Sequence, residues 1–503
     1  MGLRDSPYRS IQMLIRLKFE AYGNRKDRTN PFHWERVVLN LPGSSDYRPD
    51  LPWVMKVRFD GHLACEAFVY VDDGRITGFC REICWAAARK LASYCSRMGI
   101  QDSAPKRTGP SLTPGPWAGT MCWTNEGEVT GMVSQTKWEK TRALIKELKD
   151  MVNESLSNGE GGAVGTTMSR QRLLEIRGYL NYIVRTYSWI NPYLKGLHNT
   201  IDGWRKNRDE KGWKLSPKQM REKNQQLEED LMRLRREMEG GVGDVDLGEQ
   251  DTTSEPDKVA PVERLIRDVN ALDELTDTES PPKTNYRAPQ GLSAWYCPGD
   301  ASGKGFGTAL IMKGEGILYE EEGIAYESGM WTKEFGEQSS NFREAENLVL
   351  RIERLVEEDE GKGREIFLFT DNIVFESTYY KGYSNSEKLS DIILRLHKAQ
   401  RSGALKLHVI HIAGTRMKEW GVDGLSRGDL LEGMMAGNDP LSYIPLHKDA
   451  NERSEGSVEV WVRSWWDSSW PSQLTKLTPE MWFELRDVEG CPIACQSITV
   501  LVS

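Results

Sequence analysis

Apolar and polar positions in the second half of the chain follow strand-like and helix-like periods in turn. Short apolar runs are typical of strands, and an apolar residue at every third or fourth position is typical of an amphipathic helix. The clearest helical stripe carries Phe342, Ala345, Leu348, Ile352 and Leu355. The pattern predicts strands at 292–302, 307–313, 316–331, 366–369 and 405–412, with helices at 339–358 and 389–400.

The first half divides into a mixed part and a helical part. Residues 1–135 are expected to combine strands with a helix over 86–98. In that part an apolar run at 64–71 leads into an acidic pair, and 74–78 can return as a second strand. From 137 to 240 the pattern is largely helical, with a Gly- and Ser-rich loop near 157–167. The expected helices there are 137–152, 170–187 and 217–239.

The length and composition indicate a folded protein of several domains. At 503 residues the chain exceeds one hydrophobic core, and 38% hydrophobic residues with 17 Trp argue against disorder. No apolar run reaches the length of a membrane span, and the first residues lack a signal-peptide pattern. The eight Cys show no zinc-site spacing or dense disulfide framework, so reduced thiols and an intracellular location, in cytoplasm or nucleus, are expected.

The acidic charge of the chain is concentrated in one segment. Residues 241–280 carry twelve Asp or Glu and three Lys or Arg. The net charge of this segment is therefore −9, the same as the net charge of the whole chain. The remainder is neutral overall, so the acidic balance does not exclude nucleic-acid binding by the flanking domains. The composition of 241–290 predicts a flexible acidic linker.

Four acidic residues stand in distinctive settings in the second half. Asp300 lies in Cys-Pro-Gly-Asp-Ala-Ser-Gly, Glu344 in Ser-Ser-Asn-Phe-Arg-Glu, Asp371 in Phe-Leu-Phe-Thr-Asp-Asn, and Asp423 in Gly-Val-Asp-Gly-Leu-Ser-Arg. A single Asp at a strand end is most often a turn former or a helix cap. Four such residues in order instead suit hydrolysis by two divalent metals, which requires several carboxylates around cations about 4 Å apart.

The same four motifs, in the same order, resemble the ribonuclease H domain, especially that of gypsy and tyrosine-recombinase (DIRS-like) retrotransposons. The resemblance covers 291–430 and implies a five-stranded mixed sheet with flanking helices. It implies that Asp300, Glu344, Asp371 and Asp423 bind Mg²⁺ or Mn²⁺ and cleave the RNA strand of an RNA–DNA hybrid. Ser302 and Asn372 would then contact the substrate. One alternative stays open, because Glu346 could replace Glu344 as a ligand. His411 resembles the product-release histidine of some ribonucleases H, but its offset from Asp423 differs, so a strand-face histidine is favoured.

A second signature lies upstream, where Tyr70-Val71-Asp72-Asp73 separates an apolar strand from its return strand. This hairpin resembles the catalytic turn of reverse transcriptases, which implies that Asp72 and Asp73 bind metal and that Tyr70 contacts primer–template. The phrase that contains Gly2, Ser6 and Pro7 resembles the template–nucleotide segment of that family, and Lys106 would be a nucleotide-side lysine.

The resemblance to a polymerase implies a truncated palm over 1–135 and a helical thumb or connection over 136–240. The metal-binding Asp and the fingers that precede the Gly2 phrase in the family have no counterpart in this sequence. We therefore expect the full chain not to extend a primer, unless a second chain or another retroelement protein completes the site. Residues 431–503 contain no interpretable motif.

Three functions compete at this point. A retroelement-derived ribonuclease H accounts for all four acidic motifs. A catalytically inactive, element-derived protein could instead hold nucleic acid through basic and aromatic side chains. Sugar kinases and actin-like ATPases share an Asp-Gly or Ser-Gly strand turn, but they need two repeated domains, and this sequence contains no internal repeat.

Overall fold

The computed structural model divides the chain into two compact units. The sheet unit comprises Met1–Val133, Lys283–Tyr380 and Lys398–Ser503, and the helical unit comprises Ser134–Pro282 and Lys381–His397. No described helix is long and apolar enough to cross a membrane. The structure describes residues 6–24, 27–39, 54–70, 73–100, 109, 115–117, 119–125, 128–157, 167–238, 255–285, 293–314, 323–359, 361–429, 443–448, 450–463 and 476–477.

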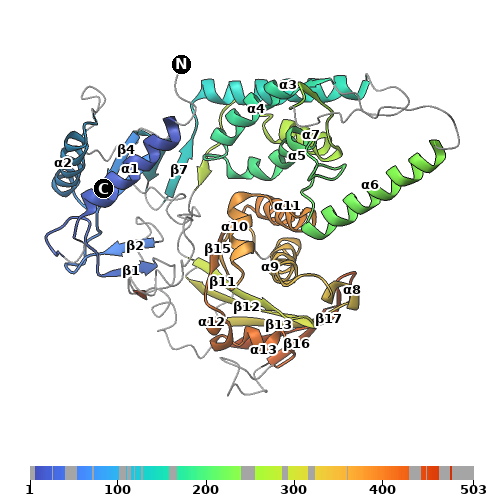
Figure 1. Cartoon of the computed structure of the whole chain (residues 1–503). Helices are drawn as coiled ribbons and strands as arrows, with labels where there is room; N and C mark the ends of the chain where they lie inside the picture. Colours follow the sequence, from blue (N-terminus) through green and yellow to red (C-terminus); the bar gives the residue numbers. More distant parts are fainter. Residues whose placement is uncertain are drawn as a thin grey trace. The chain divides into compact units, whose positions relative to one another are not determined.

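A seven-stranded mixed sheet dominates the sheet unit, in the order β15-β14-β11-β12-β13-β17-β16 (Figure 1). The first three strands along the chain pair antiparallel, and β14 and β15 then add in parallel on the other side of β11. All five strands that the sequence predicts are present. They are β11 (Ser293–Ala301), β12 (Gly305–Gly314), β13 (Gly323–Trp331), β14 (Glu365–Thr370) and β15 (Lys406–His411).

Two further strands come from the C-terminal segment 431–503, in which the sequence pattern predicts no motif. β17 (Ser454–Arg463) pairs antiparallel with β13, and β16 (Tyr443–Lys448) pairs with β17. The Ser457 hydroxyl donates to the buried Glu327 carboxylate over 2.7 Å. The prediction of five strands is therefore corrected, because the sheet has seven. Strand β17 covers the edge that β13 would otherwise expose.

Helices α9 (Ser340–Glu357) and α13 (Val422–Leu425) cover opposite faces of this sheet. A Cβ atom on Gly299 would lie 2.7 Å from Leu348 of α9, whereas one on Gly307 would lie 2.4 Å from Leu425 of α13. Asp300 pairs with Gly307 across the strands and alternates with Gly299, so its side chain lies on the α13 face. The other helices of this unit are α8 (Lys333–Gly336), α10 (Ile373–Lys381) and α12 (Gly414–Glu419). Helix α11 (Glu387–Ser402) belongs to the helical unit up to His397.

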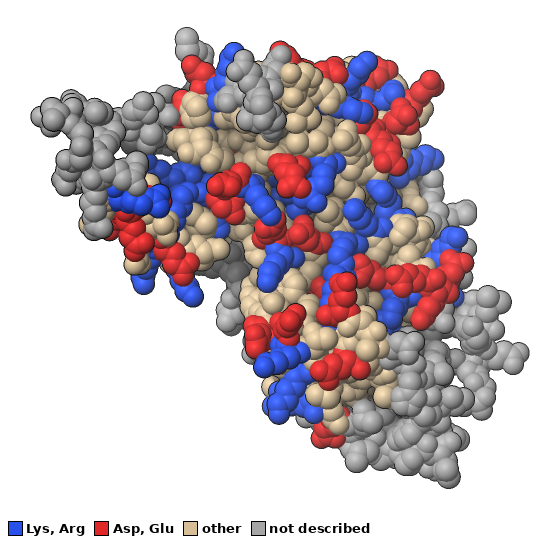
Figure 2. All heavy atoms as spheres, turned by 90° about the vertical axis from the view of Figure 1, so that its right-hand side faces the viewer, with Lys and Arg blue, Asp and Glu red and all other residues tan. Residues whose placement is uncertain are grey.

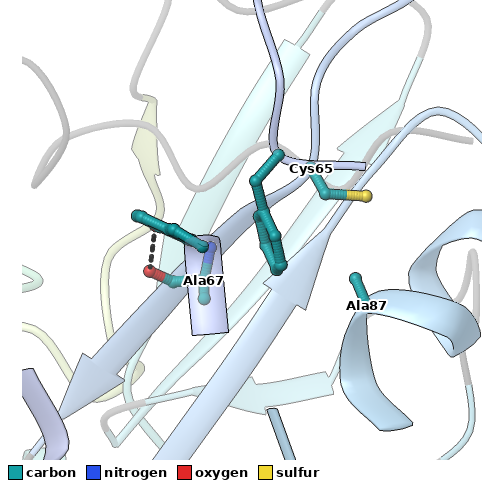
Figure 3. Packing of buried hydrophobic residues seen from close by; sticks show 5 residues of the cluster. Cys65, Ala67 and Ala87 are labelled. Atoms are coloured by element: carbon teal, nitrogen blue, oxygen red, sulfur yellow. Dashed lines mark hydrogen bonds between the residues drawn. The ribbon is translucent and has the colours of Figure 1, made fainter. Parts of the chain in front are cut away.

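The predicted acidic hairpin is present in the N-terminal part of the sheet unit. β3 (Glu66–Tyr70) and β4 (Asp73–Thr77) pair antiparallel, with Tyr70 opposite Asp73. A small core beside it joins Cys65, Ala67 and Ala87 to the rings of Tyr22 and Phe32 (Figure 3). The remaining elements are α1 (Ser6–Tyr22), α2 (Arg81–Arg97), β1 (Arg36–Leu39), β2 (Val54–Val57), β5 (Gly115–Trp117), β6 (Thr120–Asn125), β7 (Glu128–Met132), β10 (Thr284–Asn285) and β18 (Lys476–Leu477).

The helical unit contains the three helices that the sequence predicts between 137 and 240. Helices α3 and α4 pack together, and Trp138 and Tyr187 meet edge to face at 5.2 Å between ring centroids. The apolar side chains of Leu227 and Met232 on α6 are exposed. The elements are α3 (Gln135–Ser157), β8 (Met168–Ser169), α4 (Arg170–Ile183), η3 (Ser188–Leu194), α5 (Lys195–Asp202), α6 (Pro217–Met238), β9 (Lys258–Val259) and α7 (Glu263–Leu275).

Helix α7 corrects the expectation of a flexible linker over 241–290. Its residues Leu265, Val269 and Leu272 recur at helical spacing and are fully buried. A Cβ atom on Gly196 of α5 would lie 2.5 Å from the Leu265 Cα atom, so the two helices are in close contact. Composition averaged over the segment hid this apolar stripe among acidic residues. Residues 239–254 of the expected linker lie outside the described part of the chain.

We expect Leu265→Ala to lower the free energy of unfolding by roughly 2–5 kcal/mol, because it removes a buried side chain and leaves a cavity. Leu227→Ala is the matched control, since Leu227 belongs to the same unit but is 60% exposed. Chemical denaturation and limited proteolysis would measure both variants. Equal stability of the two variants would contradict the packed role of α7.

Candidate active site

The fold brings the four predicted carboxylates toward one end of the sheet. Asp300 lies near the end of β11, and Asp371 follows directly after β14. These strands are parallel neighbours, so their carboxyl ends lie at the same edge. Glu344 belongs to the first turns of α9, and Asp423 belongs to α13.

The charges of these residues act on one another. Burial raises the pKa of Asp300 to about 7, and the negative charges of Asp371 and Asp423 add to this effect. Burial also raises the pKa of Glu344 to about 7, and Asp371 and Asp300 contribute. The pKa of Asp371 is raised mainly by burial. Like charges with raised pKa values in one place are typical of a functional site.

Two carboxylate oxygens in this group are buried and lack a hydrogen-bond partner among the described residues. They are Oδ1 of Asp371 and Oδ2 of Asp423. A buried acceptor without a partner is costly, and carboxylate oxygens of this kind are the ligands that hard divalent cations prefer. Among the described residues, no group of three or more His, Cys, Asp or Glu side chains is placed so that it could hold a metal ion in this structure. The repulsion that raises the pKa values also opposes closer approach of the carboxylates when no cation is present.

The structure separates Glu344 from Glu346, which the sequence left as alternatives. Glu346 is fully buried, and Arg453 donates to its carboxylate over 2.5 Å. Glu344 instead is close enough to Asp300 and Asp371 for their charges to raise its pKa. The electrostatic interactions therefore associate Glu344 with the other acidic residues, whereas Arg453 binds Glu346. The choice of Glu344 as the metal ligand stays a prediction.

Several positioning residues of this group were not singled out by the sequence. Arg427 donates to Asp423 Oδ1 over 2.7 Å, and the Ser426 hydroxyl donates to Asp300 Oδ2 over 3.2 Å. The Asn347 amide donates to the carbonyl oxygens of Asp300 and Gly307, both at 2.9 Å, and so ties α9 to the two strands. For Arg427 the sequence held a signal, because it follows Asp423 by one helical turn.

His411 lies beside Asp371, although the sequence favoured an ordinary strand-face histidine. It is the last residue of β15 and pairs in register with Thr370 of β14. Its Nε2 atom is 3.1 Å from the Asp371 carbonyl oxygen. Burial raises the pKa of Asp371, and His411 offsets part of that effect. Only the register of the parallel strands brings these two residues together.

Ser302 and Asn372, which the resemblance assigns to substrate binding, make internal hydrogen bonds in the structure. The Ser302 hydroxyl donates to the Ser426 carbonyl oxygen over 2.7 Å. Oδ1 of Asn372 accepts the backbone N–H groups of Val374 and Phe375 at 2.9 and 3.0 Å, and so caps the start of α10. A contact of either residue with substrate stays a prediction.

The polymerase-like residues are described only in part. Tyr70 and Asp73 are placed through the backbone of β3 and β4, whereas Gly2, Asp72 and Lys106 lie outside the described residues. Ser6 and Pro7 begin α1, and their backbone alone is described. Metal binding and primer–template contact at this hairpin stay predictions.

We expect the metal-free protein to lose stability as the pH rises from about 4 to about 7. The folded protein holds protons on Asp300 and Glu344 over this range, whereas the unfolded chain releases them near the ordinary carboxyl pKa. The stabilisation is therefore complete below about pH 4 and is lost as the pH passes the folded values. Thermal unfolding in EDTA at pH 5 to 8 would measure it. Asp300→Asn should flatten the profile, and an unchanged slope would contradict this assignment.

No protein-family model matches the chain, and no curated protein sequence matches it. Among solved structures, the chain is similar to the "Structure of the foamy viral protease-reverse transcriptase dRH in complex with ds DNA", at 12% identity and a TM-score of 0.22. The match covers 69% of this chain and 46% of that chain, so this chain spans about half the length of the viral protein. This resemblance to a viral reverse transcriptase is distant.

Proposed function

We propose that the chain is a metal-dependent nuclease of the ribonuclease H type that cleaves the RNA strand of RNA–DNA hybrids. The observation that carries this proposal is the group of buried and half-buried carboxylates at one end of the sheet. Burial raises the pKa of Asp300 and of Glu344 to about 7, and the charge of Asp371 adds to both shifts. The order β13-β12-β11-β14-β15, three antiparallel strands followed by two parallel ones, also resembles the ribonuclease H fold.

Asp300, Glu344, Asp371 and Asp423 would hold the divalent cations. When bound, Mg²⁺ supplies activation of a water molecule and stabilisation of the leaving oxygen. Arg427 fixes Oδ1 of Asp423 and thereby leaves Oδ2 free to act as a ligand. Ser426 orients the Asp300 carboxylate, and His411 provides a nearby group that can carry a proton.

The choice of substrate follows from the resemblance of the four motifs, and the hairpin of β3 and β4 supports a retroelement origin. Asp73 lies at the start of the return strand, as it would in a polymerase hairpin. The competing function is nucleic-acid binding without cleavage. It predicts that hybrid binding occurs and that no metal produces strand scission.

The test is cleavage of an end-labelled RNA strand by the full chain, in an RNA–DNA hybrid and in single-stranded RNA. We expect cleavage of the hybrid with Mg²⁺ or Mn²⁺ and none in EDTA. Binding of the hybrid without cleavage under any of these conditions would favour the competing function. Equal cleavage of both substrates would contradict the specificity for hybrids.

A further inference from the structure

The helical unit contains a group of cationic side chains that the proposed nuclease site does not use. One of them, Lys195, lies on a polar face of α5. The three- and four-residue spacing of this face brings Lys195 together with His198, Asn199 and Asp202. Lys195 is only 2% exposed. A buried ammonium group is costly unless a partner compensates its charge.

Aromatic rings surround the Lys195 ammonium group. Its Nζ atom lies 4.9 Å from the centroid of the Trp213 ring and 5.2 Å from that of Tyr383. Nζ of Lys381 lies 5.0 Å from the same Tyr383 centroid, so two ammonium groups flank one ring. The rings provide cation–π attraction but no opposite charge.

Other cations near this group already have acidic partners. Arg264 pairs with Asp268 at 3.3 Å and with Asp391 at 2.8 Å. Asp202 pairs with Arg205 at 3.2 Å and with Arg208 at 3.5 Å. These pairs occupy the nearby carboxylates, so they leave little negative charge for Lys195.

Lys195, Lys381 and Arg177 form no ion pair with any residue that the structure describes. Burial lowers the pKa of Lys195 to about 8, and the charges of Arg208, Lys381 and Arg264 lower it further. Burial lowers the pKa of His198 to about 4, with contributions from Arg177 and Lys195. In both cases burial is the largest cause, neighbouring cations lower the pKa further, and Asp202 opposes them.

Buried polar atoms on the same helix face also lack partners among the described residues. They are Nε2 of His198 and both polar side-chain atoms of Asn199, which is fully buried. On the molecular face shown in Figure 2, basic and acidic side chains are interspersed. Excess cations together with unsatisfied hydrogen-bonding groups are typical of an anion site.

We propose that Lys195, Lys381 and Arg177 form a phosphate-binding site in the helical unit. Lys381 is exposed and would contact the phosphate first. The buried ammonium group of Lys195 would then compensate the negative charge of the phosphate. The phosphate group is either free or part of a nucleic-acid strand. This site is independent of the acidic residues of the sheet unit and requires no metal.

The test is calorimetric titration of the full chain with inorganic pyrophosphate in EDTA at low salt. We expect binding that weakens at least tenfold in the double variant Lys381→Ala/Arg177→Ala. The matched control is Lys206→Ala/Lys214→Ala, which removes the same charge from two exposed residues of this unit. We expect the control to bind as the parent does.

A second arm uses a labelled single-stranded oligonucleotide, also in EDTA, with fluorescence anisotropy as the readout. A tenfold loss for the Lys381/Arg177 variant in this arm alone would identify a strand phosphate as the ligand. Loss with pyrophosphate alone would identify a free phosphate. Equal weakening of the test and control variants, or no binding in either arm, would overturn the proposal. Because no metal is present, these outcomes do not depend on nuclease activity.

Discussion

Asp371→Asn is expected to remove metal-dependent cleavage of RNA–DNA hybrids while the fold stays intact. Asn has the shape of Asp but neither its charge nor its strength as a metal ligand. Metal ions contribute several kcal/mol to catalysis at such sites, so the rate should fall by roughly 10³-fold or more. Initial rates of hybrid cleavage with Mg²⁺ would measure the loss.

The matched control for this variant is Asp359→Asn. Asp359 belongs to the same unit, is exposed, and has a positive φ of 56°, which Asn tolerates well. We expect the control to retain the parent rate. In EDTA, Asp371→Asn should be at least as stable as the parent, because it removes a charge that raises the pKa values of Asp300 and Glu344. An Asp371→Asn protein that cleaves at the parent rate would refute the proposed nuclease site.

A chain that ends after residue 432 is expected to be much less stable than one that ends after residue 470. The shorter chain lacks β16 and β17, so the edge of β13 becomes unpaired. It also loses Arg453 and Ser457, which contact the buried carboxylates of Glu346 and Glu327. Removing a partner from a buried charge costs about 3–5 kcal/mol, which corresponds to a fall in Tm of roughly 10 °C or more.

Two controls make this comparison specific. The chain that ends after residue 470 lacks β18 but keeps β16 and β17, so it separates the two contributions. Arg453→Ala in the full chain should reproduce part of the loss of stability. Calorimetry of the three proteins would measure it, and equal Tm values for the two shortened chains would show that β17 is dispensable.

Helices and strands were predictable from the sequence wherever the spacing of apolar residues agreed with the turn and cap residues at the ends of the segment. The stripe from Phe342 to Leu355 gave α9, and the apolar runs gave the five strands from β11 to β15. The hairpin at Tyr70 to Asp73 was likewise visible, because its turn residues separate an apolar run from a short return strand. The segment 258–276 was misjudged because composition was averaged over the whole of 241–290, which is acidic, although an apolar residue stands at every third or fourth position of α7.

By itself, the sequence determined which residue types stand at strand ends and helix starts, and so it singled out Asp300, Glu344, Asp371 and Asp423. Which of them lie together was decided by the tertiary structure. The parallel pairing of β11 with β14 aligned Asp300 with Asp371, and the register of β15 brought His411 to the same end. The contact of Arg453 with Glu346 likewise joins segments 107 residues apart. Local propensity cannot encode such pairings, because they depend on how distant strands choose their neighbours and on the burial that follows.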